Sequence, residues 1–463
     1  MAWIWTAISV INFLWLLQVL LSLKRNRKLP PGPTGLPIIG HFHLLGKNPH
    51  QDFHNLAQKY GPIMYLRFGF VPTIVVSSPA AAELVLKTHD LIFAGRAHHQ
   101  AAKEISYDKR NIVFAQYGIY WRNMRKLCTL ELLSNFKINQ FQPMRRAEIE
   151  VFVESLQRAA GKRETVDISA KISALIGDMT CLMVFGRKFA DGDLDEKGFK
   201  AVIGETLQVA ALPNIADYFP FLAALDLQGL TRRMKELSKT FDGFLERIID
   251  DHIQNKQEKK HAQDFADTMI TIMESGEAGF EFDRRHVKAV LLQELEKVVG
   301  MDQIVEESHL DRLEYLDMVV KETLRLHPAV PLLIHESLED CVVDQFHVPK
   351  GSRLIVNVWS IGKDPNAWRE PQKFLPERFI GSNIDLRGQD FQLIPFGSGR
   401  RGCPGLQLGL TVVRLVLAQL VHCFDWELPD GMVASELDMA EHFGLVTCRE
   451  NHLLAVPTYR LLK

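Results

Sequence analysis

The sequence predicts a mainly α-helical globular fold with small β-sheets, placed behind an N-terminal membrane anchor. The chain has 463 residues, of which 47% are hydrophobic and 24% are charged, so it contains enough apolar material for a large buried core. Strand-like runs rich in β-branched residues are short, and they occur at 62–79, at 352–358 and near the C-terminus. Apolar residues recur at helical spacing in five stretches: 80–88, 118–133, 147–160, 235–254 and 310–326.

The N-terminal segment 1–23 is the predicted anchor. It contains no Asp, Glu, Lys, Arg or His, and at about 1.5 Å per residue it is long enough to cross a hydrocarbon core of about 30 Å. A cleaved signal peptide is the alternative, but no small-residue cleavage site precedes the first charges. The basic cluster that follows is expected to stay in the cytosol: Lys24, Arg25, Arg27 and Lys28.

Segment 24–40 is predicted to be a basic, proline-rich hinge between the anchor and a single domain at 41–463. Four prolines fall within eight residues, and proline fixes φ and removes amide donors. We therefore expect a stiff extended strap in this stretch rather than a continued helix. The four prolines are Pro30, Pro31, Pro33 and Pro37.

Charge and cysteine content exclude several classes of function. Lys plus Arg number 54 and Asp plus Glu number 56, so the net charge of −2 gives no general attraction to nucleic acid. No CxxC pair occurs, which argues against a disulfide framework, a zinc ribbon and a CxxCH attachment site. Each of the six cysteines is therefore considered alone: Cys128, Cys181, Cys341, Cys403, Cys423 and Cys448.

The loop "PFGSGRRGCPG" at 395–405 is the strongest chemical signal in the chain. It lacks the Gly-Lys-Ser/Thr ending of a phosphate cradle and the GxGxxG pattern of a dinucleotide turn. A catalytic thiol with a distant His partner, or a buried structural Cys, remains open. The pattern favours a metal thiolate, because Pro404 can begin an apolar helix that runs to Cys423 and directs its positive end at Cys403.

The glycines and one arginine of the loop fit the same interpretation. Gly399 and Gly402 permit a tight turn whose amides can hydrogen-bond a sulfur atom, and Gly405 leaves room for a flat macrocycle. Arg401 can then bind a carboxylate of that macrocycle.

Five residues of this loop spell FxxGxRxCxG, which resembles the haem-binding signature of the cytochrome P450 family: Phe396, Gly399, Arg401, Cys403 and Gly405. The resemblance implies the fold of that family, haem as the cofactor and Cys403 as the axial iron ligand. Together with the anchor and the proline strap, it covers nearly the whole chain and is closest to the plant microsomal branch.

Further motifs occur in the order that the family would have. "KETLRLHP" supplies Glu322 and Arg325 as an ExxR pair, and "FLPERF" supplies Arg378 as the third member of a buried ion cluster. The ExxR pair alone is weak evidence for this buried cluster, because "EFDR" at 281–284 matches the same pattern and most such pairs are exposed to solvent. The resemblance also implies haem propionate contacts by Trp121 and Arg125 in "YWRNMRKLC" and by His335 in "LLIHES", although a surface role for His335 stays open.

The resemblance implies a monooxygenase of the endoplasmic reticulum, single-pass, with its catalytic domain in the cytosol. Electrons would come from NADPH-cytochrome P450 reductase, for which Arg122, Lys126 and Arg400 are docking candidates, although they can equally be solvated charges. The expected substrate is a small lipophilic or aromatic molecule of plant secondary metabolism. Three apolar segments would contact it: 209–222, 329–334 and 443–446.

One departure from the family pattern falls between Leu292 and Gln293. There "HVKAVLL" runs directly into "QELEKVVG", and the long helix that would cross over the haem with its acid and Thr is missing. No catalytic acid and Thr pair is therefore identified. Three interpretations remain: a monooxygenase by descent with impaired activity, a haem-thiolate lyase or isomerase, and a non-catalytic membrane protein.

Overall fold

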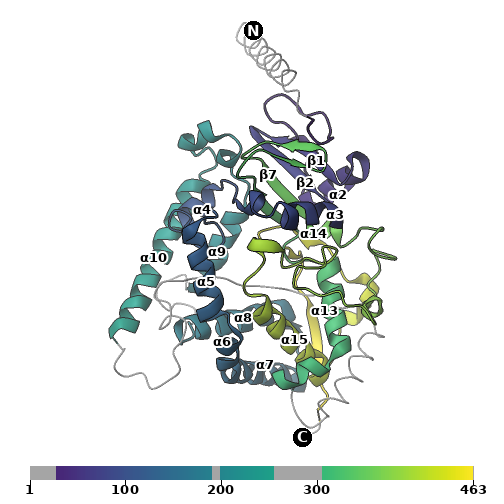
Figure 1. Ribbon diagram of the computed structural model, residues 1–463. Coiled ribbons are helices and arrows are strands. Elements are labelled where there is room, and N and C mark those ends of the chain that lie inside the picture. The colour runs from purple at the N-terminus through teal and green to yellow at the C-terminus, as the bar shows by residue number, and fades with distance from the viewer. Residues whose placement is uncertain (1–27, 190–198, 255–304, 462–463) are drawn as a thin grey trace, which may run out of the picture.

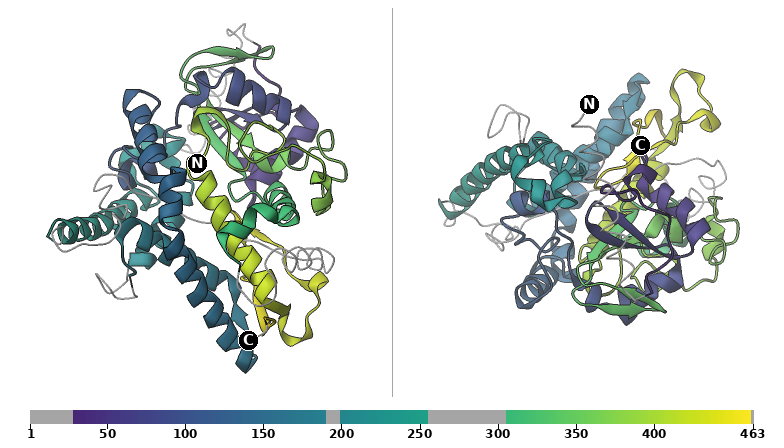
Figure 2. Two further views of the ribbon diagram at one scale, coloured as in Figure 1. Left: turned by 60° about the horizontal axis from the view of Figure 1, so that its bottom comes forward. Right: turned by 90° about the horizontal axis from the view of Figure 1, so that it is seen from above.

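The computed structural model describes residues 28–189, 199–254 and 305–461, and within these ranges the chain is mainly helical with small sheets. The predicted fold class is thereby confirmed. Figures 1 and 2 show helices α4, α5, α9 and α10 on one side of the molecule and the largest sheet, with α2, α3 and α14, on the other. The predicted anchor at 1–23 and the Leu292–Gln293 junction both lie outside the described residues.

All five predicted helical stretches are helical in the structure. The helices are α2 (Pro49–Tyr60), α3 (Pro79–Glu83), α4 (Gln100–Ile105), α5 (Ile119–Leu127), α6 (Asn135–Gln140), α7 (Gln142–Lys162), α8 (Ile168–Phe185), α9 (Phe199–Ala211), α10 (Leu230–Gln254), α13 (Glu314–Leu326), α14 (Val358–Ile361) and α15 (Leu406–Cys423). The strands are β1 (Ile63–Phe68), β2 (Val71–Val76), β3 (Val166–Asp167), β4 (Leu332–Glu336), β5 (Cys341–Val343), β6 (Phe346–Val348), β7 (Arg353–Asn357), β8 (Phe424–Glu427), β9 (Glu441–His442), β10 (Cys448–Arg449) and β11 (Leu454–Tyr459).

The largest sheet has the strand order β1-β2-β7-β4. The predicted hairpin at 62–79 forms its β1–β2 pair, with Gly69 in the turn at φ +58°, a conformation that favours glycine. Pro72 is tolerated inside β2 because the parallel pairing with β7 begins only at Thr73, so no ladder hydrogen bond is lost. Strand β4 then pairs antiparallel with β7 and brings His335 opposite Leu354.

The proline-rich stretch packs along β1, but the predicted extended strap is wrong for its end, because 36–40 is a tight turn closed by Leu36 and Gly40. The backbone N–H of Tyr65 donates to the carbonyl of Pro31 at 2.9 Å, and Gly40 bridges to Phe68. Gly32 is needed for this approach, since a Cβ there would overlap the carbonyl oxygen of Tyr65. The described part of the predicted hinge is therefore docked on the sheet.

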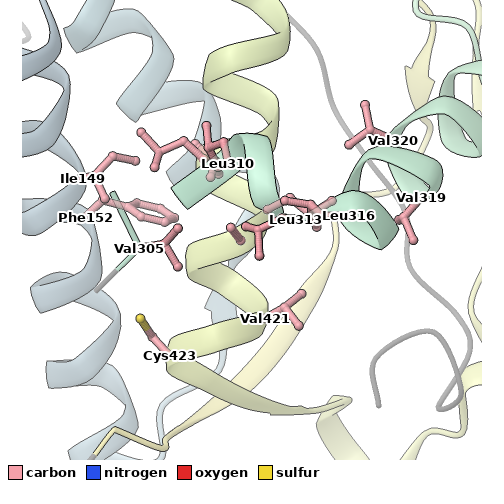
Figure 3. Packing of buried hydrophobic residues seen from close by; sticks show 14 of the residues in the cluster. Ile149, Phe152, Val305, Leu310, Leu313, Leu316, Val319, Val320, Val421 and Cys423 are labelled. Atoms are coloured by element: carbon pink, nitrogen blue, oxygen red, sulfur yellow. The ribbon is translucent and has the colours of Figure 1, made fainter. Parts of the chain in front are cut away.

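The main hydrophobic core surrounds α15 and joins it to α7 and α13. Figure 3 shows Phe152 of α7 and Leu316 of α13 in this cluster, together with Val421 and Cys423 of α15. The buried amide of Gln419 pairs with the backbone N–H and C=O of Val305 at 3.3 and 2.6 Å, so its polar atoms are satisfied inside the core. The C-terminal half of α15 is thus held rigidly.

Two described helices, α8 and α15, are long and apolar enough to cross a membrane. Half of the α15 segment and a third of the α8 segment are buried inside the domain. Because α15 carries residues of the main core along its length, its apolar composition is explained by packing within the domain.

Gly362 provides a test of this packing. Its backbone is right-handed helical, but a Cβ there would overlap the carbonyl oxygen of Arg325 at the end of α13. We expect Gly362→Ala to lower the free energy of unfolding by a few kcal/mol. Gly243→Ala is the control, because Gly243 faces open space on α10 and the change should stabilise the helix by about 0.5–1 kcal/mol. Urea unfolding measures both, and equal effects would contradict the proposed overlap.

Candidate active site

The loop at 395–405 is a tight turn leading into α15. The amide of Cys403 donates to the carbonyl of Phe396 at 2.8 Å, and the amide of Gly402 donates to the carbonyl of Gly399 at 3.1 Å. Gly399 has φ +64°, and a Cβ there would overlap the carbonyl oxygen of Leu86. Only glycine fits this position, because both the left-handed backbone and the close approach exclude a side chain.

Two details of the predicted loop are corrected. Helix α15 begins at Leu406 with Gly405 as its N-cap, so Pro404 lies before the helix instead of starting it. The Gly402 amide is used by Gly399, so the amide that hydrogen-bonds the Cys403 sulfur is that of Gly405. Gly405 does leave the space next to the sulfur open, since the nearest atom to a Cβ there would be Sγ of Cys403 at 3.9 Å.

The Cys403 side chain is exposed to the cavity described below, whereas Cys128 and Cys423 are buried. Burial of the loop nevertheless raises the pKa of the Cys403 thiol, and the Gly405 amide and Arg125 offset this only in part. The predicted stabilisation of the thiolate by the helix start is present through the Gly405 amide, but burial outweighs it. A bound cation would be needed to deprotonate this thiol at neutral pH, as cations do when a cysteine ligates them.

Three arginines, here called the arginine cluster, line the same cavity as Cys403: Arg96, Arg125 and Arg401. Each donates to backbone carbonyls, Arg96 to Ile334 at 2.6 Å, Arg125 to Gly402 at 2.5 Å and Arg401 to Ala115 at 2.7 Å. No carboxylate of the described chain forms an ion pair with any of the three. Burial and the charges of Arg96 and Arg125 lower the pKa of Arg401 to about 9. Three uncompensated cations at one end of a cavity fit an anionic group bound there.

Trp121 and His335 border the arginine cluster, and each makes one hydrogen bond within the chain. The indole N–H of Trp121 donates to the Ile112 carbonyl at 3.0 Å, and the ring stacks under Arg401 at 4.4 Å. Trp121 thus supports Arg401 from below, and its contact with a propionate stays a prediction. His335 is 4% exposed, so it is not a surface residue, and its Nδ1 contacts the Phe93 carbonyl at 3.0 Å.

The cavity has a volume of about 2650 Å³ and is lined mainly by apolar side chains. Cys403 and the arginine cluster border it, and the facing sides of α8 and α15 line it with residues such as Ile176, Met179, Val413 and Leu420. Ordinary ligand pockets occupy about 300–1000 Å³. This space therefore has room for a large planar cofactor and a ligand together.

The structure brings Glu322, Arg325 and Arg378 together in the interior. Glu322 is fully buried and receives two hydrogen bonds of 2.8 Å from the guanidinium of Arg325, while Arg378 Nε lies 3.1 Å from both carboxylate oxygens. The amide of Leu375 adds a fourth donor at 2.7 Å. The remaining donors of both arginines reach backbone carbonyls at 362–373, so the cluster ties α13 to this irregular segment.

The sequence did not indicate that Arg96 belongs to the site, and it suggested Arg400 as a docking residue only because of its charge. Arg96 stands in "FAGRAHH", far from any motif, and only the fold brings it beside His335. Arg122 and Lys126 are exposed on α5, but Arg400 forms an ion pair with Asp90 at 3.1 Å. The alternative ExxR at 281–284 lies outside the described residues.

Replacing Glu322 should show how much the buried cluster of Glu322, Arg325 and Arg378 contributes to the free energy of unfolding. We expect Glu322→Gln to lower the free energy of unfolding by roughly 3–5 kcal/mol, because two buried guanidinium groups lose their counter-charge. Glu236→Gln is the matched control, since Glu236 pairs with Arg232 and Arg233 at the exposed surface and should cost less than about 1 kcal/mol. Similar losses for the two variants in denaturant titrations would refute the assignment.

The pH dependence of the free energy of unfolding should reveal the lowered pKa of His335. Burial, and then the charge of Arg96, lowers its pKa from 6.5 to about 3, so the folded chain binds this proton less readily than the unfolded chain. His335 therefore contributes stability above pH 6.5 that is lost as the pH falls towards 3. We expect the haem-free chain to lose about 2 kcal/mol more than His335→Asn between pH 6.5 and 4.5. Parallel stability curves for the two chains would contradict this.

Comparisons with known proteins agree with this geometry. The family model described as cytochrome P450 matches residues 30–293 and 282–454. Cytochrome P450 CYP736A12 of Panax ginseng is 50% identical over 486 aligned positions, which cover 96% of each chain. Cytochrome P450 71AP13 of Prunus mume is 39% identical, covering 94% of this chain and 91% of its own, and cytochrome P450 84A1 of Arabidopsis thaliana is 35% identical, covering 99% and 96%.

The residues present fit the cofactor of this family. Cys403 offers one thiol to the cavity, the arginine cluster offers positive charge without internal carboxylates, and Gly405 leaves the space beside the sulfur open. Among the residues that the structure describes, no group of three His, Cys, Asp or Glu could hold a metal ion. The chain belongs to the cytochrome P450 family, whose members bind haem iron through a cysteine thiolate and act as monooxygenases.

Proposed function

We propose that this chain descends from a monooxygenase that hydroxylates a small lipophilic or aromatic substrate with electrons from NADPH-cytochrome P450 reductase, and that its own activity is impaired. The observation that carries the impairment is the split family match, 30–293 and 282–454, which breaks around the Leu292–Gln293 junction. The alignment with the Panax ginseng relative has 486 positions, more than the 463 residues of this chain. The relative therefore contains residues that this chain lacks.

The cavity supports the same proposal. Apolar side chains of α8 and α15 face each other across it, and no helix of the described ranges packs between them. Apolar surface that stayed uncovered there would cost free energy of folding, about 25 cal/mol per Å². A wall missing from this space would weaken cofactor retention and admit water.

Each residue of the site has a defined task in this proposal. Cys403 would hold the haem iron, and the arginine cluster would bind the two haem carboxylates and relieve the mutual repulsion of its three charges. When bound, haem supplies the activation of dioxygen. Trp121 keeps Arg401 in place, and the apolar lining orients the substrate and excludes water. The chain offers no identified acid and Thr pair for proton delivery, and we propose that this contributes to the impairment.

The substrate proposal rests on three apolar segments that the fold brings to the cavity. Residues 209–213, 329–334 and 443–446 all line it, and they come from the end of α9, from β4 with its approach, and from the β9–β10 hairpin. Phe221, inside the first predicted segment, is instead 66% exposed and lies outside the lining. The lining itself favours a small lipophilic molecule over a polar one.

Docking of the reductase is proposed on the face that carries α5. Arg122 and Lys126 are exposed there, each directly after Trp121 or Arg125 in the helix, so electrons would enter near the arginine cluster. Arg400 contributes less net charge, because Asp90 neutralises it. Complementary charge at such a surface speeds encounter and falls with ionic strength.

Attachment to the endoplasmic reticulum membrane is supported by an exposed apolar patch, defined as Leu36, Ile39, Phe70, Phe221, Leu225 and Leu227. Printed contacts join its segments: the amide of Gly69 donates to Ile39, and Phe70 packs edge-on against Phe221 at 5.5 Å. The patch lies at the β1–β2 end of the molecule, where the described chain begins (Figure 1). An exposed apolar patch suits a lipid surface, and its position near the start of the described chain is compatible with the proposed anchor at 1–23.

The decisive experiment compares the chain as written with a chain carrying a family-like helical segment, including its acid and Thr, at the Leu292–Gln293 junction. We expect the chain as written to retain haem weakly and to hydroxylate little, and the restored chain to recover both. Haem content, the carbon monoxide difference spectrum and NADPH-dependent turnover of lipophilic aromatics are measured with reductase present.

Two controls complete this comparison. In the restored chain Cys403→Ser should abolish the thiolate spectrum, while Cys423→Ser, a buried cysteine of the main core that does not line the cavity, should keep it. Equal turnover by the unrestored chain would refute the impairment. Haem loading without any turnover in the restored chain would favour a lyase or isomerase, and loading in neither would favour a non-catalytic membrane protein.

The apolar patch generates a separate prediction. With the anchor 1–23 removed, the double variant Phe221→Ser and Leu225→Ser should bind phosphatidylcholine vesicles several-fold less than the same chain without these substitutions. Co-sedimentation with vesicles measures this. Val151→Ser, an exposed apolar position on α7, is the control and should bind like the parent. An unchanged double variant would show that the patch does not touch lipid.

A further inference from the structure

The cavity has a second cationic position, at Arg353, that neither the family motifs nor the arginine cluster includes. Arg353 is the first residue of β7 and lies opposite Glu336 in the β4–β7 ladder. Successive residues of a strand point to opposite faces, so Arg353 and Glu336 share one face of the sheet while His335 and Leu354 share the other. His335 borders the arginine cluster. Since Arg353 lies on the other face of the sheet, it is separate from that cluster.

The Arg353 side chain is buried but poorly compensated. It is 7% exposed, and its one hydrogen bond with the described chain runs from Nη2 to the His98 carbonyl at a long 3.4 Å. Its Nε has no partner, and the guanidinium stacks on Tyr218 at 4.8 Å. A buried guanidinium usually has a carboxylate or several carbonyls, since desolvation of its charge is otherwise costly.

The nearby carboxylates do not neutralise it. Asp217 Oδ1 accepts the amide of Gln100 at 2.6 Å, and Oδ2 lies 3.7 Å from His99, so this group is engaged at the start of α4. Glu336 lies opposite Arg353 and the two charges interact, but they form no ion pair, and burial raises the pKa of Glu336. The other titratable groups around Arg353 are basic: His98, His99 and Lys109. Among the described residues, Arg353 has no carboxylate within ion-pair distance.

The residues around Arg353 also indicate what kind of molecule could bind there. Arg353 lines the cavity beside Phe68, Ile355 and Leu332, which are apolar. A molecule with one anionic oxygen pair and an apolar body would satisfy both parts of this wall. Planar guanidinium and carboxylate groups match each other in two parallel hydrogen bonds.

We propose that Arg353 is a substrate-recognition residue that binds the carboxylate of a lipophilic carboxylic acid inside this cavity. The inference rests on the proposed function, because it takes the cavity to be the substrate space. It adds the substrate class, an apolar acid in place of a neutral lipophile, and the residue that selects it.

The test compares 3-phenylpropanoate with its methyl ester, two ligands that share an apolar body and differ in charge. Binding to the full chain in detergent is measured by isothermal titration calorimetry at pH 7.5, with no need for turnover. We expect the wild-type chain to bind the acid at least about tenfold more tightly than the ester. Arg353→Met should remove this preference and leave ester binding within about twofold, and Arg353→Lys should retain only part of it.

Controls separate a local effect from misfolding. Arg158→Met removes an exposed arginine of α7 and should keep the preference for the acid. Retained ester binding by Arg353→Met shows that the cavity is intact; if that variant fails to fold, the acid-to-ester ratio of Arg353→Lys decides.

The outcomes distinguish this inference from the proposed function. Equal binding of acid and ester by the wild-type chain, or an acid preference that survives in Arg353→Met, overturns the role of Arg353 and leaves the monooxygenase proposal standing. Binding of neither ligand by the wild-type chain overturns both. A chain that prefers the acid through Arg353 but never shows a thiolate spectrum supports the inference while the proposed function fails.

Discussion

The burial of the Glu322 carboxylate is the constraint on which the other parts of this structure depend. A fully buried charge is tolerable only when it is paired and hydrogen-bonded, and here Arg325, Arg378 and the Leu375 amide supply those bonds. Their remaining donors reach the carbonyls of 362–373, a stretch without a strand or long helix of its own. Side-chain bonds thus hold the segment that leads towards the Cys403 loop.

At the cavity, in contrast to the Glu322 cluster, buried charges lack partners of opposite charge among the described residues. The arginine cluster and Arg353 are buried or half-buried cations without ion-pair partners among the described residues. Burial lowers the pKa of Arg96 to about 10, and burial together with the charges of Arg96 and Arg125 lowers the pKa of Arg401 to about 9. A protein tolerates such an arrangement where a ligand supplies the missing negative charge. The two cationic positions differ in neighbours: the arginine cluster interacts with the thiol through Arg125, and Arg353 faces apolar residues and Tyr218.

The thiol itself shows how far a local motif determines chemistry. Glycines at 399 and 405 allow the loop to form and leave space at the sulfur, yet burial still raises the pKa of Cys403. Helix dipole and amide contribute too little to ionise it alone, since desolvation opposes the anion. The loop is a site prepared for a cation, and it is not a nucleophile by itself.

The sequence by itself determined the fold class, the five helical stretches, the β1–β2 hairpin and the identity of the haem loop, because these depend on local periodicity, glycine placement and spacing. It also grouped Glu322, Arg325 and Arg378. Only the tertiary structure decided that Trp121 donates to Ile112, that Arg96 joins Arg125 and Arg401, and that Arg353 faces the cavity without a counter-ion. Those facts depend on contacts between segments tens to hundreds of residues apart and on burial, and neither is encoded in any short run of the chain.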